Sequence, residues 1–205
     1  MHGAKVGAAL VVFVVLLVLV TRPSFLFGNK MTSHDGPFAS RHLRLAWRFQ
    51  GTWSHPEGLD EASTTSGGWQ RHTSTFFQGR SPTDFESQLT VVTIEHGEMP
   101  SQEDLRAFGT AELTDRPFPR TCVALDDGRN GQRCDSTIIM DKRSLSSLEE
   151  YFLLGPRVVF VHGLVPANQT SPGASGTTPK ADRQGNPALE KLLGMIASME
   201  PFESK

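Results

Sequence analysis

The sequence predicts an α+β protein in which a single N-terminal transmembrane helix precedes a mainly antiparallel sheet flanked by helices. Three observations predict this class. An uncharged apolar run fills residues 6–20, several later segments show the alternation or β-branched composition of strands, and two segments have the caps and apolar spacing of helices. Residues 41–205 are long enough for one globular domain of ordinary size.

The apolar run VGAALVVFVVLLVLV predicts a membrane anchor over residues 1–27, with residues 6–27 contacting the membrane. It is short, because a span needs about 20 apolar residues and a secretory signal only about 7 to 15. The absence of a small-x-small cleavage pattern after it favours an uncleaved signal anchor. A signal peptide cleaved at Leu26-Phe27-Gly28 is the alternative.

The flanking charges bear on orientation. Lys5 precedes the run, whereas Arg22 and Lys30 come after it, and a simple count of basic residues would leave the globular part in the cytosol. Leading apolar runs with a short basic head nevertheless usually export the chain on their C-terminal side. We therefore expect a single-pass membrane protein whose globular domain is extracytoplasmic, in the periplasm or exported.

Two segments are predicted to be irregular. Residues 28–40 mix Gly, Ser, Asn, Asp and Pro without periodicity and indicate a flexible tether. Residues 166–186 have a similar composition and indicate a disordered loop inside the domain of residues 41–205. Because the chain beyond residue 30 has more acidic than basic residues and no basic cluster, a nucleic-acid partner is not expected.

Strands are predicted where apolar residues alternate or β-branched residues gather. Over residues 43–49, Leu43, Leu45, Trp47 and Phe49 share one side, as in a half-buried strand. The other predicted strands are residues 69–77, 88–96, 121–125, 133–140 and 157–165, of which 121–125 and 133–140 form a hairpin.

Two helices are predicted from their caps. Ser101 can cap a helix over Gln102–Leu113, with Asp104 at the spacing of a capping box. Asn186 can cap a closing helix that has Pro187 in its first turn. The apolar stripe of this second helix, which must lie on a sheet, comprises Leu189, Leu192, Leu193, Ile196 and Met199.

The order of these elements resembles the PsbP/Mog1 type of α-β-α sandwich over roughly residues 43–202. The resemblance is carried by a leading strand with Trp47 and Trp53, an antiparallel meander with an inserted helix, and a closing amphipathic helix that ends at Ile196–Phe202. It implies a small accessory or assembly protein without enzymatic activity, often at or beyond a membrane. It implies no site residue, because the group has no shared motif to match.

One segment is similar to part of an enzyme fold. Val158–Gly163 looks like the strand and His-Gly turn beside the oxyanion hole of α/β-hydrolases. That chemistry needs a G-x-S-x-G elbow, and Gly173–Thr177 lacks the final glycine. His162 is therefore predicted to be a strand-end residue without a catalytic role.

Metal and cofactor sites are not predicted. Glu95 and His96 point to opposite faces of their predicted strand, and no paired C-x-x-C or H-E-x-x-H motif is present. Asp126–Gly131 is similar in sequence to the start of a calcium-binding loop. Gly128, however, stands at the third position, where such a loop has a ligand, so the segment is interpreted as a tight turn. No catalytic, cofactor-binding or metal-binding residue is therefore assigned.

The position of the two cysteines is explained by that turn. If the hairpin is centred on Gly128, Cys122 and Cys134 lie directly opposite each other, close enough for a disulfide. Such a bond is expected outside the cytosol, whereas two reduced buried thiols are the alternative in a cytosolic domain.

Three classes of function remain open. The first is a membrane-anchored, non-catalytic accessory module of the cell envelope that binds a protein partner and needs no cofactor. The second is a structural subunit of a membrane assembly. The third is an enzyme whose site assembles from distant residues such as His55, His72, His96 and Asp84.

Overall fold

The computed structural model describes residues 31–56, 60–64, 68–81, 83–96, 101–114, 121–126, 128–167 and 186–202. The anchor predicted over residues 1–27 lies outside them, as does most of the loop predicted over residues 166–186. The elements in chain order are β1 (Met31–Ser40), β2 (Leu45–Pro56), β3 (Glu61–Thr64), β4 (Trp69–Ser81), β5 (Asp84–His96), α2 (Gln102–Thr114), β6 (Thr121–Ala124), β7 (Gly131–Met140), β8 (Arg143–Leu154), β9 (Arg157–Pro166), α3 (Pro187–Ala197) and β10 (Glu200–Pro201).

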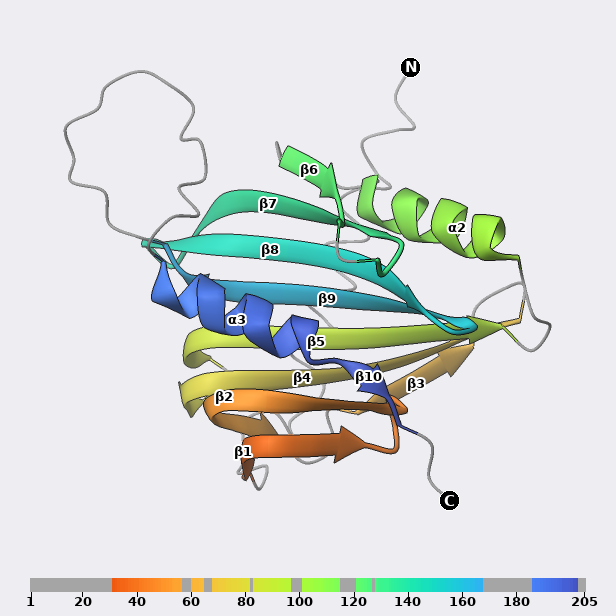
Figure 1. The fold of residues 1–205 in the computed structure, drawn as a ribbon. Coiled ribbons are helices and arrows are strands. Elements are labelled where there is room, and N and C mark those ends of the chain that lie inside the picture. The colour runs from red at the N-terminus through yellow and green to blue at the C-terminus, as the bar shows by residue number, and fades with distance from the viewer. Residues whose placement is uncertain are drawn as a thin grey trace, which may run out of the picture. The chain divides into compact units, whose positions relative to one another are not determined.

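The strands form one sheet in the order β1-β2-β4-β5-β9-β8-β7-β6, with β3 beside β4 and β10 beside β2 (Figure 1). The registered pairs are antiparallel, and β4, β5, β9, β8 and β7 pair along most of their lengths. The join between β2 and β4 differs, because only Ser54 and Phe77 are in register there.

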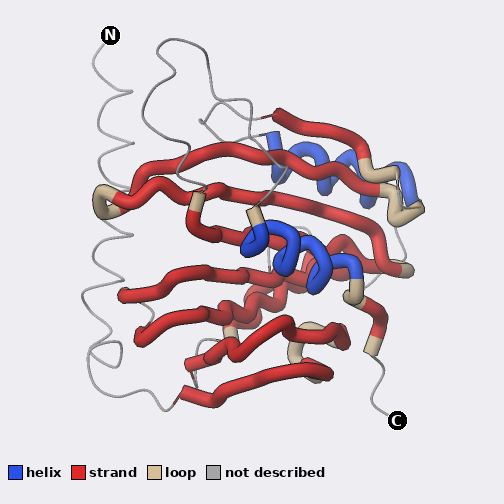
Figure 2. The backbone as a smooth tube through the Cα atoms, turned by 60° about the vertical axis from the view of Figure 1, so that its left-hand side comes forward, coloured by secondary structure: helices blue, strands red, loops and turns tan. Residues whose placement is uncertain are grey.

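The two helices pack on opposite faces of the sheet. On β9, Val159 and Val161 belong to the core under α3, whereas Val158 and Phe160 belong to the cluster around α2. This alternation is the two-residue period of a strand that is buried on both sides. In the turned view of Figure 2, α3 lies across the front of the central strands.

The closing helix α3 is fixed by its cap and its stripe. The Asn186 side chain accepts hydrogen bonds from the amides of Ala188 (3.1 Å) and Leu189 (3.2 Å), and its own amide donates to the Pro166 carbonyl at 2.9 Å. The fully or nearly buried residues of the helix are Leu189, Leu192, Met195 and Ile196. The predicted helix is confirmed with two differences: Leu193 is only partly buried, and the helix ends at Ala197, so that the buried Met199 lies after it.

The helix α2 begins with the predicted capping box. The Ser101 amide donates to Asp104 Oδ2 at 3.2 Å, and the Asp104 amide donates to Ser101 Oγ at 3.1 Å. Leu105 is fully buried. Gly109 lets the helix approach the sheet, since a Cβ there would lie 2.5 Å from the ring of Tyr151.

The predicted α+β class is wrong. Most of the described residues lie in the antiparallel sheet, and α2 and α3 are two short helices packed on it. Among the described residues, neither helix combines the length and apolar character needed to cross a bilayer. The better description is a mainly antiparallel β fold that carries two helices.

Four strands were not predicted. The two-residue strand β10 falls in the segment predicted as the end of the closing helix. The strand β8 is central, but Glu149 and Glu150 interrupt its apolar pattern. The strand β1 falls in the segment predicted as a tether, and its polar sequence with Gly36 and Pro37 gives no strand period. The short strand β3 is exposed along its whole length. In each case the pairing comes from neighbouring strands rather than from a local pattern.

The contact between Gly163 and Leu192 gives a first prediction. A Cβ at Gly163 would lie 2.2 Å from Leu192 Cδ2, so we expect Gly163→Ala to displace α3 and lower the free energy of unfolding. Leu192→Ala alone should cost about 2 to 5 kcal/mol, as truncation of a buried leucine does. Urea unfolding of both single variants and the double variant measures the coupling.

The double variant should be more stable than the sum of the two single effects predicts, because the smaller side chain makes room for the new methyl group. Leu193→Ala, one residue along and only partly buried, is the matched control and should cost less than Leu192→Ala. Strict additivity in the cycle would contradict this packing.

Candidate functional site

Four histidines gather where the β1–β2 hairpin meets β3 and β4. His34 lies on β1, His42 in the turn before β2, His55 near the end of β2 and His72 on β4. They are far apart in the sequence, and contacts with β4 bring them to one region: His34 and His55 pack on Phe76, and His42 packs on His72. We call these four residues the histidine joint.

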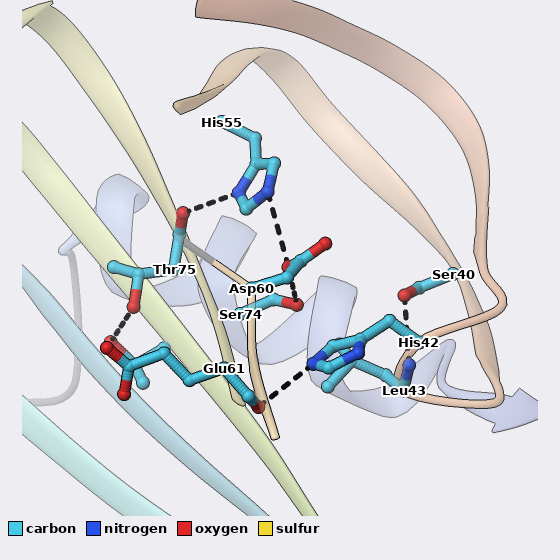
Figure 3. A network of polar contacts seen from close by, with 9 residues as sticks. Ser40, His42, Leu43, His55, Asp60, Glu61, Ser74 and Thr75 are labelled. Atoms are coloured by element: carbon cyan, nitrogen blue, oxygen red, sulfur yellow. Dashed lines mark hydrogen bonds and ion pairs between the residues drawn. The ribbon is translucent and has the colours of Figure 1, made fainter. Parts of the chain in front are cut away.

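His55 is held by two acceptors. Its Nδ1 donates to the Thr75 carbonyl at 2.9 Å, and its Nε2 lies 3.3 Å from Asp60 Oδ1 (Figure 3). A carbonyl and a carboxylate both only accept, so the ring bonds both of them as an imidazolium. Burial lowers the pKa of His55. The bonds to Asp60 and Thr75 raise this pKa, and their combined effect is larger than that of burial, so the pKa lies above 6.5.

Asp60 is the centre of this group. It accepts a hydrogen bond from Ser74 Oγ and pairs with His55. The bond to His55 is the largest influence on its carboxyl group and, with the bond from Ser74, outweighs burial, so that the pKa of Asp60 lies below 3.8. Asp60 thereby ties the segment before β3 to both β2 and β4.

The order of these side chains is not that of a catalytic triad. Nucleophilic catalysis needs a histidine between the serine and the carboxylate, so that the ring can take the serine proton. Here Asp60 lies between Ser74 and His55, and Ser74 is almost fully buried. The arrangement cross-links strands and has no activated nucleophile.

His42 and His72 form a second pair. Their ring centroids are 5.0 Å apart, and His42 Nε2 donates to the Glu61 carbonyl at 3.1 Å (Figure 3). His72 Nδ1 is buried without a hydrogen-bond partner. Burial, followed by the effect of His42, lowers the pKa of His72 below 6.5, and the nearby carboxylate of Glu95 opposes this only in part.

An aromatic cluster fills the space between the hairpin and β4. Phe76, on β4, is its centre and is almost completely buried. Five rings lie with their centroids 5.0 to 6.2 Å from that of Phe76, and they belong to His34, Phe38, Trp47, Phe49 and His55. These contacts have the separations of favourable aromatic pairs.

Of the distant residues named as a possible enzyme site, the structure brings only His55 and His72 into one region. His96 ends β5, where its ring packs on Trp69 at 4.9 Å, and Asp84 begins the same strand at its other end. In the described part of the chain, no three His, Cys, Asp or Glu side chains are placed to hold a metal ion.

The hydrolase-like segment is a continuous strand. Gly163 pairs with Leu89 on one side and Leu148 on the other, so no turn comes after His162. His162 therefore lies inside β9 rather than at a strand end, with Nε2 3.1 Å from Ser147 Oγ.

The disulfide prediction is confirmed. Cys122 on β6 and Cys134 on β7 are opposite each other and bonded. The connection between the strands turns through Gly128 and Asn130, both with positive φ, where glycine and asparagine are favoured. The calcium-like segment is thus the hairpin turn.

Sequence reasoning missed a buried ionic group. Glu150 on β8 is fully buried and lies 3.0 Å from Arg129 Nη2 and 2.6 Å from Arg133 Nη2. Arg129 also donates to the carbonyl of Ile196 at 3.1 Å, near the C-terminus of α3. A charged pair of residues inside an otherwise apolar segment, Glu149-Glu150, was the available signal.

Comparisons with known proteins assign no family. No family model matches the chain, and no curated protein matches it. One similar solved structure is a crystal structure from Bacteroides thetaiotaomicron VPI-5482, with 10% identity and a TM-score of 0.46. The match covers 83% of this chain and 49% of that one, so the chain spans about half that protein's length. A likeness at this level assigns neither fold nor function, and the PsbP/Mog1 resemblance stays a prediction.

The pair of His55 and Asp60 predicts a pH-dependent contribution to stability. Because its folded-state pKa is raised, His55 stabilises the fold below pH 6.5 and loses this effect as the pH rises through the folded value. Because its pKa is lowered, Asp60 stabilises above pH 3.8 and loses this effect as the pH falls through the folded value. The contribution should therefore be full between 3.8 and 6.5.

Urea unfolding of the parent protein and of Asp60→Asn across this range measures the effect. The difference between them should be largest inside the window and shrink on both sides. Glu61→Gln is the matched control, because His42 bonds the backbone of Glu61 and not its carboxylate. A difference for Asp60→Asn that stayed constant with pH would show that the ion pair is not formed.

Proposed function

We propose that this protein is a non-catalytic module that binds a partner protein along the β6–β7 edge of its sheet and works in an oxidising compartment outside the cytosol. One observation carries the proposal. Among the described residues, the two large apolar side chains that are exposed are Val123 on β6 (38%) and Ile139 on β7 (82%), and both belong to this edge.

The two side chains lie on the same face. Val123 is opposite Arg133, whose side chain reaches Glu150 on the face covered by α3. Ile139 is six residues beyond Arg133 on the same strand, and so points to the same side. They thus form parts of one surface.

The strand geometry suits the addition of an extended segment. Within the described residues, β6 pairs with β7 only over Gln132–Asp135, whereas β7 continues through Ser136–Met140. This continuation is uncharged and rich in β-branched residues. Edge strands of this composition can bind extended peptides, with main-chain hydrogen bonds giving affinity and alternate side chains giving specificity.

The proposal of a non-catalytic module is supported by the hydrogen bonds around His55. His55, Asp60 and Ser74 bond one another and the backbone of Thr75. Groups engaged in this way are not available to take a proton from a substrate.

The compartment is supported by the disulfide. Disulfides persist in oxidising spaces and are rare where thiols are kept reduced. The bond between Cys122 and Cys134 holds β6, a strand of four residues, to β7. It therefore stabilises the edge that we propose as the binding surface.

Photo-crosslinking in the native cell tests the binding edge. A photoreactive residue at position 139 should give a discrete adduct with one partner protein, whereas the same residue at Glu103, exposed on α2, should not. With the purified partner, Ile139→Lys should weaken binding by about tenfold or more, because an edge lysine disfavours strand pairing. The exposed Lys142→Ala is the control and should bind normally. Equal crosslinking at both positions, or unchanged affinity of Ile139→Lys, would contradict the proposal.

The disulfide gives a separate prediction. Protein purified from its native compartment without reductant should contain no titratable thiol. Replacing both cysteines with serine should lower the free energy of unfolding by about 2 to 3 kcal/mol, since the bond closes a loop of 12 residues. Denaturant unfolding with and without reductant measures this. Two free thiols per chain would argue for a cytosolic protein.

A further inference from the structure

The β1–β2 hairpin is attached to the rest of the sheet mainly by side chains. Its backbone register with β4 is limited to Ser54 and Phe77, near the end of β2. By contrast, β4 and β5 are paired from Trp69 to Ser81. The first half of β2 is held elsewhere, by β10 at Leu45 and Ala46. The seam between the hairpin and the β3–β4 pair is thus a weakly bonded line in the sheet.

Histidines occupy this seam along its length. At one end His42 bonds the β3 backbone at Glu61 and faces the ring of His72 on β4. At the other end His55 bonds Thr75 of β4 and Asp60, and His34 packs with it around Phe76. The contacts that close the seam therefore depend on groups that gain charge at mildly acidic pH.

We propose that this seam is a pH-sensitive joint: it is closed when His34 and His72 are neutral, and protonation of these two histidines opens it. The opening moves β1 and the turn before β2 away from β3 and β4 and uncovers the aromatic cluster around Phe76. Ser54, the pair of His55 and Asp60, and the β10 pairing remain as attachments, so the end of β2 stays in place and the hairpin stays part of the domain.

The charges around His72 favour this response. The groups that face it are His42 and Arg44 from the turn, Glu95 from β5 and Arg157 from β9. Glu95 is the carboxylate of this set, and it already pairs with Arg44 at 3.1 Å and with Arg157 at 3.0 Å. A proton on His72 therefore adds a positive charge to a group that is already net positive, and does so without a hydrogen-bond acceptor for the buried Nδ1.

The surroundings of His34 also disfavour its protonated form. Its ring lies among apolar rings, 4.5 Å from that of Phe38 and 5.9 Å from that of Phe49. The charged group that faces it is the imidazolium of His55, whose counter-ion Asp60 is engaged by His55 and Ser74. Protonation of His34 thus places a second positive charge beside that of His55, and the two charges repel each other.

The titration of these residues agrees with the geometry. Burial, and then repulsion by His55, lowers the pKa of His34 below 6.5, and burial with repulsion by His42 does the same for His72. A base whose pKa is lowered in the folded state favours the open or unfolded state once the pH falls below 6.5. His55 has the opposite effect, because its charged form pairs with Asp60. This pair holds the end of β2 at acidic pH and weakens only as the pH rises through the raised pKa of His55.

Hydrogen–deuterium exchange of the full chain, followed by mass spectrometry from about pH 8 to about pH 5, tests the proposal. After correction for the intrinsic effect of pH on exchange, amides of β1, the following turn and β3 should exchange about tenfold faster or more at the acidic end, because charged His34 is repelled by His55 and charged His72 is repelled by Arg44 and Arg157. Amides of β5, β9 and β8 should change little. A high salt concentration should reduce the effect, because it screens the repulsion.

Two sets of variants link the effect to the joint. His34→Phe, which replaces the histidine by another aromatic ring, combined with His72→Gln should reduce the acid-induced exchange. His162→Gln is the matched control, since this histidine lies on β9 and bonds Ser147. It should leave the effect unchanged. If the double variant does not fold, the exchange pattern of the parent chain still decides.

Each possible exchange pattern either supports the proposed joint or overturns it. Faster exchange confined to the hairpin and β3 below pH 6.5, and reduced by salt, supports the joint. Unchanged exchange over the whole range overturns it. Faster exchange spread evenly over β5, β8 and β9 also overturns it, because that pattern means global unfolding. None of these results depends on the β6–β7 edge, so the joint and the binding surface can fail separately.

Discussion

The fold depends on the packing of α3 against β9 at a position where the strand has no side chain. Gly163 leaves the space that Leu192 fills, and a larger residue there would force the Leu192 side chain or the helix to move. Both ends of α3 are fixed around this contact. Asn186 caps the first turn and bonds the end of β9, and Arg129 bonds the carbonyl of Ile196 in the last turn, where a positive charge is favourable. The core formed by β2, β4, β5, β8 and β9 closes around the helix placed in this way.

Arg129 also couples this core to the binding edge that we propose. Its guanidinium pairs with the buried Glu150 and lies 4.5 Å from the ring centroid of Phe152. Since Arg129 belongs to the turn between β6 and β7, one side chain connects that turn, β8 and α3. A buried carboxylate is costly without such partners, so the fold keeps Glu150 only because Arg129 and Arg133 converge on it.

The sequence predicted those parts whose signal is local. The caps at Ser101 and Asn186, the stripe of α3 and the symmetric spacing of Cys122 and Cys134 each lie within a few turns or one hairpin, and the structure contains all of them. The parts that it could not predict depend on distant partners. Glu150 looks like a break in a strand until Arg129 and Arg133 are placed beside it. The histidine joint was missed for the same reason, because His34 and Phe38 lie in a polar segment whose strand character comes only from pairing with β2.

The two edges of the sheet differ in the kind of interaction that holds them. The β6–β7 edge is fixed by a covalent bond and by a buried ionic group of Glu150 with two arginines. The β1–β2 edge is held by histidines, aromatic rings and one registered position with β4. Between them, β5, β9 and β8 are paired along most of their lengths. Opening of the histidine side therefore need not disturb the opposite edge, and a pH response on one side of the sheet is compatible with constant geometry on the other.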